Sequence, residues 1–150
     1  MKINDPAATL NAGVLAEALT AWKRAFDQHR PEDMVRLFSR DALFQGLSPT
    51  LLTGRKEIFD YFDALPPGIT ATFQIIQARE LAQDLACGFA ALRFTYPDAR
   101  TTQVQLSLVG RRDGETWLIA QYHASRTFQG KQPPTSPLAA MMNPFAVDEA

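Results

Sequence analysis

Cysteine is nearly absent from this sequence of 150 residues, in which Cys87 is the only one. A single cysteine excludes an intrachain disulfide, a CxxC redox pair and a thiolate metal cage. Neither sign of charge dominates, because 15 Lys and Arg stand against 16 Asp and Glu, which gives a formal net charge of −1. That balance argues against general electrostatic capture of DNA or of an anionic membrane. We therefore expect no nucleic-acid partner.

Long hydrophobic runs are also missing. The longest apolar runs fall far short of the roughly 20 residues that a membrane span needs, and no signal-peptide stretch begins the sequence. The hydrophobic fraction of 46% and the charged fraction of 21% are ordinary for a folded protein and exclude a largely disordered or collagen-like chain. We expect a cytoplasmic protein with no membrane partner, a single domain over 1–128, and a Pro-rich tail over 129–150 whose order the sequence leaves open.

Three segments have the residue spacing of helices. Over 9–29 the apolar residues recur at steps of three and four, which places them on one stripe of a long amphipathic helix. Pro31 and the two acidic residues after it suit the first turn of a short second helix. A third helix is predicted over 55–65, and the Pro-Pro-Gly sequence at 66–68 ends it.

The remainder of the domain has the composition and period of strands. The run 42–44 predicts one short strand. Four longer segments are rich in Ile, Val, Thr, Phe and Tyr: 70–81, 85–96, 101–111 and 116–128. Short polar turns separate them, so they form antiparallel hairpins. The sequence thus predicts an α+β fold in which three N-terminal helices cover one face of a strongly curved antiparallel sheet.

The alternation along two of these strands leaves the assignment of the sheet faces open. Arg93 alternates with apolar neighbours in one strand, and Gln105 and Ser107 do so in the next. In the simplest interpretation the apolar set faces the helices and the polar set faces water. Periodicity alone does not decide between this and the opposite arrangement.

Several short motifs follow one another along the chain: Ala21-Trp22, Leu37 to Gly46, Thr53-Gly54-Arg55, Arg111 to Gly114, Trp117-Leu118-Ile119 and Tyr122 to Ser125. Together they resemble the SnoaL-like families, most of all the branch near the association domain of calcium/calmodulin-dependent kinase II, over residues 10 to 128. The resemblance implies a nuclear transport factor 2-like cone with a pocket inside and a homodimer through the outer sheet face. This fold hosts isomerases, cyclases, dehydratases, hub domains and binding proteins, so it constrains the position of a site more than its chemistry.

Two departures from the family narrow what the resemblance implies. Ketosteroid isomerases of this fold carry a catalytic aspartate a few residues after the Asp-Ala pair, where this chain has Gln45-Gly46-Leu47. The association domain lines its pocket with several arginines, of which matching by segment retains Arg93 and replaces two others with Ser107 and Ala124. That matching turns these three positions inward. It turns the alternate apolar residues toward a partner subunit: Leu92, Phe94, Val104 and Leu106.

Six residues are candidates for ligand binding: Arg93, Tyr122, Gln105, Ser107, Trp22 and Tyr61. A buried guanidinium needs an acidic or carbonyl partner, so Arg93 is either a ligand contact, a structural ion pair or an exposed side chain. Tyr122 offers a hydroxyl to a ligand or to the backbone of the core. Gln105 and Ser107 share a strand face, which is either a pocket wall or solvated. Trp22 and Tyr61 belong to the helices that close the cone in this family, as pocket wall or as core.

The catalytic residues are not assigned by the sequence, and His123 and Tyr122 are the only candidates. Nothing near His123 in sequence orients an imidazole for acid–base work, so a hydrogen bond across the sheet or at a dimer contact is its other interpretation. His29 ends the first helix and is interpreted as a cap. Two histidines far apart predict no metal. The absence of GxSxG, Walker and dinucleotide motifs removes the common hydrolase and nucleotide functions, and we expect no cofactor.

The sequence therefore supports two functions. The first is a homodimeric protein that binds a small organic molecule in a cone-shaped pocket and acts, if it is an enzyme, as an isomerase, dehydratase or cyclase by proton transfer. The second is a non-catalytic association module that assembles through the outer sheet face.

Overall fold

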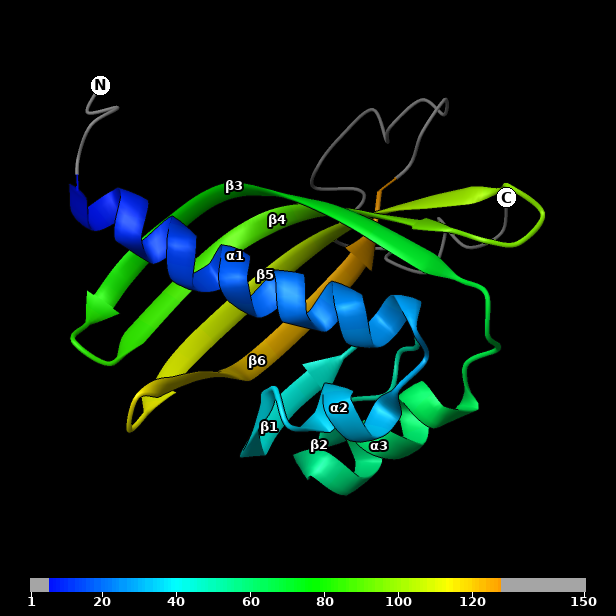
Figure 1. The fold of residues 1–150 in the computed structure, drawn as a ribbon, viewed down its shortest axis with the longest axis horizontal. Helices are drawn as coiled ribbons and strands as arrows, with labels where there is room; N and C mark the ends of the chain where they lie inside the picture. The colour runs from blue at the N-terminus through cyan, green and yellow to red at the C-terminus, as the bar shows by residue number, and fades with distance from the viewer. Residues whose placement is uncertain (1–5, 128–150) are drawn as a thin grey trace, which may run out of the picture.

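The computed structural model describes the backbone of residues 6–127 and the side chains of residues 13–127; the predicted tail over 129–150 lies outside them. Two helices begin the fold and a third follows the first two strands (Figure 1). The elements are, in order, α1 (Pro6–Asp27), α2 (Pro31–Val35), β1 (Phe38–Gln45), β2 (Leu52–Thr53), α3 (Gly54–Ala64), β3 (Thr70–Ala82), β4 (Leu85–Thr95), β5 (Thr101–Asp113) and β6 (Thr116–Arg126).

The six strands form one sheet in the order β2-β1-β6-β5-β4-β3. All neighbouring strands are antiparallel except β1 and β6, which pair in parallel, with Phe44 opposite Tyr122. The predicted α+β fold with a mainly antiparallel sheet is thus present. Only two of the three predicted helices stand at the N-terminus, because β1 and β2 precede α3, as the strand predicted at 42–44 already implied. The parallel strand pair was not predicted. Hairpin turns predict only local pairing, and the β1–β6 pair joins segments far apart in sequence.

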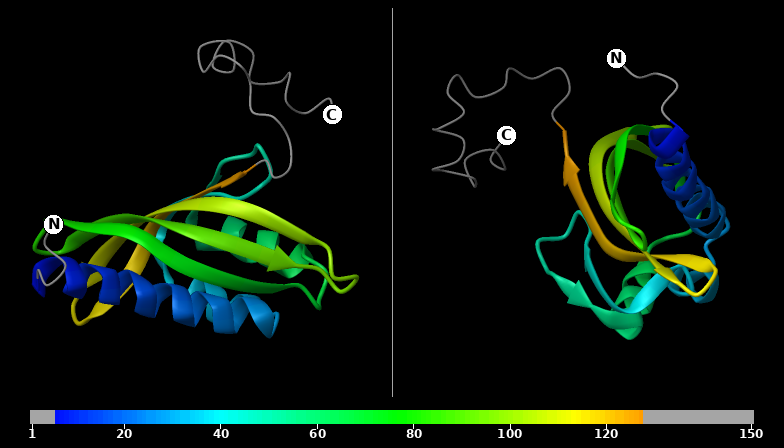
Figure 2. Two further views of the ribbon diagram at one scale, coloured as in Figure 1. Left: turned by 90° about the horizontal axis from the view of Figure 1, so that it is seen from above. Right: turned by 90° about the vertical axis from the view of Figure 1, so that its left-hand side faces the viewer.

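The sheet is strongly curved, and the curvature encloses α1. Bulges interrupt β3 between Ile75 and Gln77 and again between Glu80 and Ala82, and a bulge bends its strand and increases the local twist. Figure 2 shows the sheet curling around α1, which lies along its concave face. The short helices α2 and α3 pack together with β1 at one end of the sheet. The enclosed end between them is where a pocket can form.

The C-terminal half of α1 is attached to the edge strand β3 by polar side chains. The backbone N–H of Ala71 donates to Asp27 Oδ1 (2.8 Å), and Lys23 Nζ donates to the carbonyl of Ala71 (2.6 Å). An edge strand leaves such backbone groups unpaired, so this contact both satisfies them and fixes the end of the helix. His29 then ends the helical turn in the left-handed region (φ 52°), with its N–H donating to the carbonyl of Phe26 (3.0 Å).

The apolar residues of β4 and β5 face the helices, which corrects one of our expectations. The four residues expected to face a partner subunit are all in the core: Leu92, Phe94, Val104 and Leu106, exposed by 8% or less. Arg93 and Gln105 alternate with them and are exposed on the convex face. Helix α1 brings Trp22 and Phe26 to the concave face, and burying each large apolar side chain there contributes about 1.5–3 kcal/mol.

Candidate functional site

A pocket of about 70 Å³ opens at the end of the cone where β3 begins and β4 ends. The residues that line it come from α1, α3, β4, β6 and the loop after β1: Phe26, Gly46, Leu47, Tyr61, Phe62, Leu65, Ile69, Phe94, Tyr96, Tyr122 and Ala124. This wall is aliphatic and aromatic apart from three tyrosine hydroxyls, and it contains no charged side chain. Small-molecule sites typically combine such an apolar wall with a few placed polar groups.

The three tyrosines come from elements that are distant in sequence. Tyr61 projects from α3, Tyr96 follows the end of β4, and Tyr122 lies in β6. The ring of Tyr122 is held between two others: it stacks on Phe44 (centroids 4.5 Å apart, planes at 12°) and on Trp22 (6.1 Å, 29°). Tyr122 is only 3% exposed, so its position is fixed by packing.

Two of the hydroxyls receive hydrogen bonds that leave their own protons free to donate. Thr102 Oγ1 donates to Tyr96 Oη (3.3 Å), and the backbone N–H of Leu47 hydrogen-bonds the Tyr61 hydroxyl. Gly46 allows Tyr61 this position, because a Cβ at residue 46 would collide with Tyr61 Oη. Hydroxyls that already accept a bond present their O–H groups as donors.

Burial holds the phenols in their neutral form. Burial raises the pKa of Tyr122, and the nearby Tyr61 hydroxyl raises it further. The pKa of Tyr61 is also raised by burial, with the Leu47 amide acting in the opposite direction and Tyr96 adding to the rise. Both groups are therefore protonated near neutral pH and act as hydrogen-bond donors.

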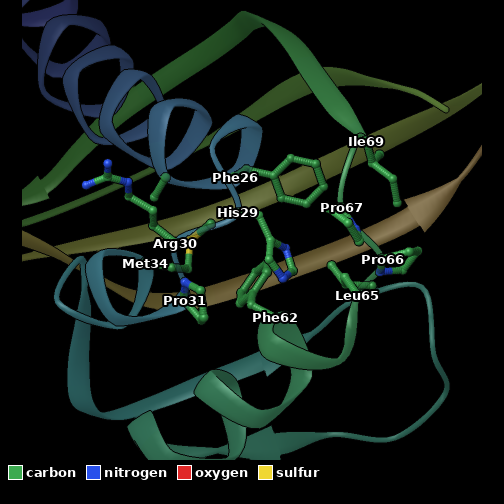
Figure 3. Close-up of a pocket in the computed structure, with 12 residues that line it drawn as sticks. Phe26, His29, Arg30, Pro31, Met34, Phe62, Leu65, Pro66, Pro67 and Ile69 are labelled. Carbon is green, nitrogen blue, oxygen red and sulfur yellow. The ribbon is translucent and has the colours of Figure 1, made fainter. Parts of the chain in front are cut away.

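A second, smaller hollow lies beside the tyrosine pocket, between the end of α1, α2 and the loop at 66–68 (Figure 3). Its volume is about 10 Å³, which is room for about one water molecule. The two hollows share four apolar side chains: Phe26, Phe62, Leu65 and Ile69. His29 and Arg30 line only the smaller hollow, so this apolar wall lies between their polar groups and the tyrosine hydroxyls.

The candidate residues from the sequence divide between the two faces of the sheet. Tyr61 and Tyr122 line the pocket, and ligand binding by them remains a prediction. Trp22 is fully buried behind Tyr122 and is not part of the pocket wall. Its indole N–H has no hydrogen-bond partner among the described residues.

Arg93, Gln105 and Ser107 do not lie in the pocket, which corrects the inward orientation that the family matching implied. They lie on the convex face, opposite to the buried Leu92 and Leu106. With the Gln103 amide oriented to accept, its oxygen takes hydrogen bonds from Arg93 Nε (2.6 Å) and Nη2 (2.8 Å). The guanidinium is satisfied there without a ligand.

His123 also lies on the convex face and is exposed. Its neighbours across the sheet are Ser107 on β5 and Gln45 on β1, not the hydroxyl of Tyr122, whose side chain points to the concave face. Successive residues of a strand point to opposite faces, so His123 and Tyr122 cannot act together on one molecule in the pocket.

Sequence reasoning missed Tyr96 as part of the site, and it considered Gly46 and Leu47 only as the place where related isomerases carry a catalytic aspartate. The alternation of Phe94 and Tyr96 with polar residues carried the signal for Tyr96, because both continue the buried face of β4. The residue types of Gly46 and Leu47 carry no signal of their own, but the family resemblance points to their position, which the parallel pairing of β1 with β6 brings to the pocket.

Within 13–127, no three His, Cys, Asp or Glu side chains come together as a metal site requires. No helix in the described part of the chain is both long and apolar enough to span a membrane.

The curved sheet that encloses α1, with a hollow where β4 ends, has the nuclear transport factor 2-like fold. The family model of the SnoaL-like domain matches residues 15–129. The chain therefore belongs to the SnoaL-like domain family. A search of the curated proteins gives no match.

Solved structures agree on the fold. A domain with a cystatin-like fold from Nostoc punctiforme PCC 73102 has a TM-score of 0.72 at 19% identity and covers 93% of this chain and 96% of its own. A calcium/calmodulin-dependent protein kinase II association-domain-like protein from Xanthomonas campestris has a TM-score of 0.66 at 20% identity, covering 75% and 85%. An NTF2-like protein from Pseudomonas putida KT2440 has a TM-score of 0.67 at 15% identity, covering 87% and 99%. At such identities the likeness concerns the fold alone.

Proposed function

We propose that the protein is a homodimeric small-molecule-binding protein whose ligand occupies the tyrosine-lined pocket. The observation that carries this proposal is that three tyrosines from elements distant in sequence, Tyr61, Tyr96 and Tyr122, line one otherwise apolar hollow. Packing and hydrogen bonds position these groups before any ligand arrives. Preorganised polar groups in an apolar wall lower the cost of ordering a ligand.

The same geometry limits the chemistry of a catalytic version. Proton-transfer reactions such as isomerisation or dehydration develop negative charge on a substrate oxygen, and neutral phenol donors stabilise that charge in a pocket of low dielectric. Structures of this fold include a ketosteroid isomerase-like protein and a hexachlorocyclohexane dehydrochlorinase. No carboxylate or imidazole is among the residues that line the pocket. The protein's own contribution to such a reaction is therefore stabilisation of charge, with the base supplied by water or by the substrate.

The convex face of the sheet is the surface that we propose for the homodimer. Phe89 on β4 is 53% exposed, and Ile76 on β3 is 50% exposed. The register opposes Phe89 to Gln77 of β3, at the bulge that follows Ile76, so these two apolar side chains lie close together. Exposed apolar residues grouped on one face are typical of interaction surfaces. A second copy of the chain is the occupant that the family resemblance favours.

The first experiment on the pocket is native mass spectrometry of gently purified protein, followed by denaturation of the same sample and extraction of small molecules. We expect a dimer that carries a co-purified organic molecule. Ala124→Leu places a larger side chain in the pocket and should remove that molecule, whereas the same change at the exposed Ala82, at the far end of β3, should not. Retention of the molecule by the Ala124 variant would refute the pocket assignment.

The homodimer has its own test. Phe89→Asp puts a charge on the convex face and should shift the protein to monomer mass in light scattering at micromolar concentration. Leu51→Asp is the matched control, because Leu51 is equally exposed (55%) but lies in the loop before β2. A Phe89 variant that remains dimeric would place the interface elsewhere. A larger assembly without any co-purified molecule would favour the non-catalytic association module.

A further inference from the structure

Neither positively nor negatively charged side chains line the pocket. The 11 lining residues include no Lys, Arg, His, Asp or Glu. Arg93, the cation expected to fix an anionic ligand, lies on the convex face, bonded to Gln103. His29 and Arg30 are separated from the tyrosines by the wall that contains Phe26 and Phe62. Arg100 lies over the ring of Tyr96, with its guanidinium carbon 5.6 Å from the ring centroid, but it does not line the pocket and is paired with Asp98. A charged ligand group would therefore lose its hydration in the pocket without gaining an unpaired counter-charge among the lining residues.

The hydrogen-bonding groups of the pocket also have a defined direction. Tyr96 Oη already accepts from Thr102, and the Tyr61 hydroxyl already receives the Leu47 amide. None of the hydrogen bonds described for residues 13–127 involves the hydroxyl of Tyr122, whose ring lines the pocket. Each phenol therefore has a proton to donate, and the pocket needs oxygen or nitrogen acceptors from its ligand.

The size of the pocket bounds the ligand. About 70 Å³ is roughly half the volume of an engineered apolar cavity of about 150 Å³ that admits benzene. The pocket is open on one side, so part of a ring can remain outside it. A compact molecule that places its acceptor at the tyrosines and its apolar body along Phe26, Phe62 and Phe94 matches these limits.

We infer that the pocket selects neutral, compact, largely apolar molecules that carry a carbonyl-type hydrogen-bond acceptor, and that the Tyr122 hydroxyl donates a hydrogen bond to this acceptor. This inference rests on the proposed function, since it names the ligand class of the same pocket. It excludes carboxylates, phosphates and amines as preferred ligands. Tyr122 is the specificity-determining residue, because it is the only one of the three tyrosines that is buried and its hydroxyl takes part in none of the hydrogen bonds described for residues 13–127.

The test uses four ligands of similar shape that differ in charge and in acceptor: acetophenone, benzoate, benzylammonium and ethylbenzene. Binding to the full-length protein is measured by saturation-transfer NMR and by titration of chemical shifts, which suit weak affinities. We expect acetophenone to bind most tightly and both ions to bind at least tenfold more weakly. Tyr122→Phe should weaken acetophenone about 3- to 10-fold, the value of one net hydrogen bond, and should leave ethylbenzene within twofold.

The outcomes separate failure of this inference from failure of the proposed function. Benzoate or benzylammonium binding as tightly as acetophenone, and competing with it, would overturn the selection of neutral ligands while leaving the pocket as a binding site. If Tyr122→Phe weakens the binding of acetophenone and of ethylbenzene equally, Tyr122 has a packing role. That result would overturn its assignment as the hydrogen-bond donor to the ligand. If none of the four binds, or if Ala124→Leu leaves their binding unchanged, the pocket itself is refuted.

Discussion

Two glycines beneath Leu15 provide a sharp test of how α1 lies on the sheet. Gly88 in β4 and Gly110 in β5 both face the concave side, and both lie against the Leu15 side chain. An added Cβ at Gly88 would be 2.6 Å from the carbonyl oxygen of Gln77 and 2.7 Å from Leu15 Cδ1. At Gly110 the nearest atoms would be at 3.5 Å (Leu15 Cδ2) and 3.6 Å (Trp117 Cε3), which is ordinary contact.

The two alanine variants should therefore differ in the free energy of unfolding, with only Gly88→Ala destabilising the protein. Overpacking by a methyl group costs about 1–3 kcal/mol. The upper part of that range applies to Gly88→Ala, because the carbonyl of Gln77 belongs to the β3 backbone and cannot move without disturbing the β3–β4 pairing. Replacing glycine by alanine stabilises the folded state by about 0.5–1 kcal/mol, because it reduces the conformational entropy of the unfolded chain. The expected net effects are a loss of about 2 kcal/mol for Gly88→Ala and a change between zero and about 1 kcal/mol of stabilisation for Gly110→Ala.

Urea unfolding followed by circular dichroism measures both changes, with equal slopes m as the condition for comparing midpoints. For a domain of this size, about 2 kcal/mol also corresponds to a melting temperature lower by roughly 4–8 °C. If Gly88→Ala unfolds at the wild-type urea concentration, or if the two variants are equally destabilised, then Gln77 of β3 and Leu15 of α1 do not approach Gly88 as the structure has it.

Three further predictions concern titration and the pocket. The hydrogen bond from Arg111 holds the pKa of the exposed Asp41 below its usual value. The stability from this pair is therefore present above the usual carboxyl pKa and is lost as pH falls through the lowered value. Arg111→Met should raise the midpoint of Asp41 in an NMR titration, and an unchanged midpoint would exclude the pair. Burial raises the pKa of Tyr122. Its contribution to folding stability is therefore complete below the unfolded pKa of about 10 and is lost as pH rises above that value. Tyr122→Phe should move alkaline unfolding, followed at 295 nm, to higher pH, and a shift to lower pH would contradict this. Gly46→Ala should displace the Tyr61 hydroxyl and weaken acetophenone binding severalfold with a stability loss of about 1–2 kcal/mol, and unaltered binding would remove Tyr61 from the site.

Local patterns predict the elements of this fold well, because each depends on residues close in sequence. The Asp113-Gly114 hairpin, the helix over α3 and the four long strands all have local signals. The short strand β2 and the parallel pairing of β1 were missed, since both depend on contacts between distant segments. The pocket residues also divide into those with local signals and those that depend on distant contacts. Tyr61 and Tyr122 were candidates by their own chemistry, whereas Gly46 and Leu47 reach the pocket only through the β1–β6 pair.

The two interpretations of the sheet faces show why one residue of offset decides the composition of the pocket. Matching to the association domain placed Arg93, Ser107 and Ala124 inside, and only Ala124 is in the pocket wall. Side chains alternate with a period of two, so an offset of one residue on β4 and β5 relative to β6 exchanges the two faces of those strands. The simpler rule, that an apolar set covered by helices faces them, gives the observed arrangement because burying Leu92, Phe94 and Leu106 outweighs any position inherited through weak matching. The same step changes the expected ligand, since it replaces a guanidinium in the pocket with phenol hydroxyls and an anion with a neutral acceptor.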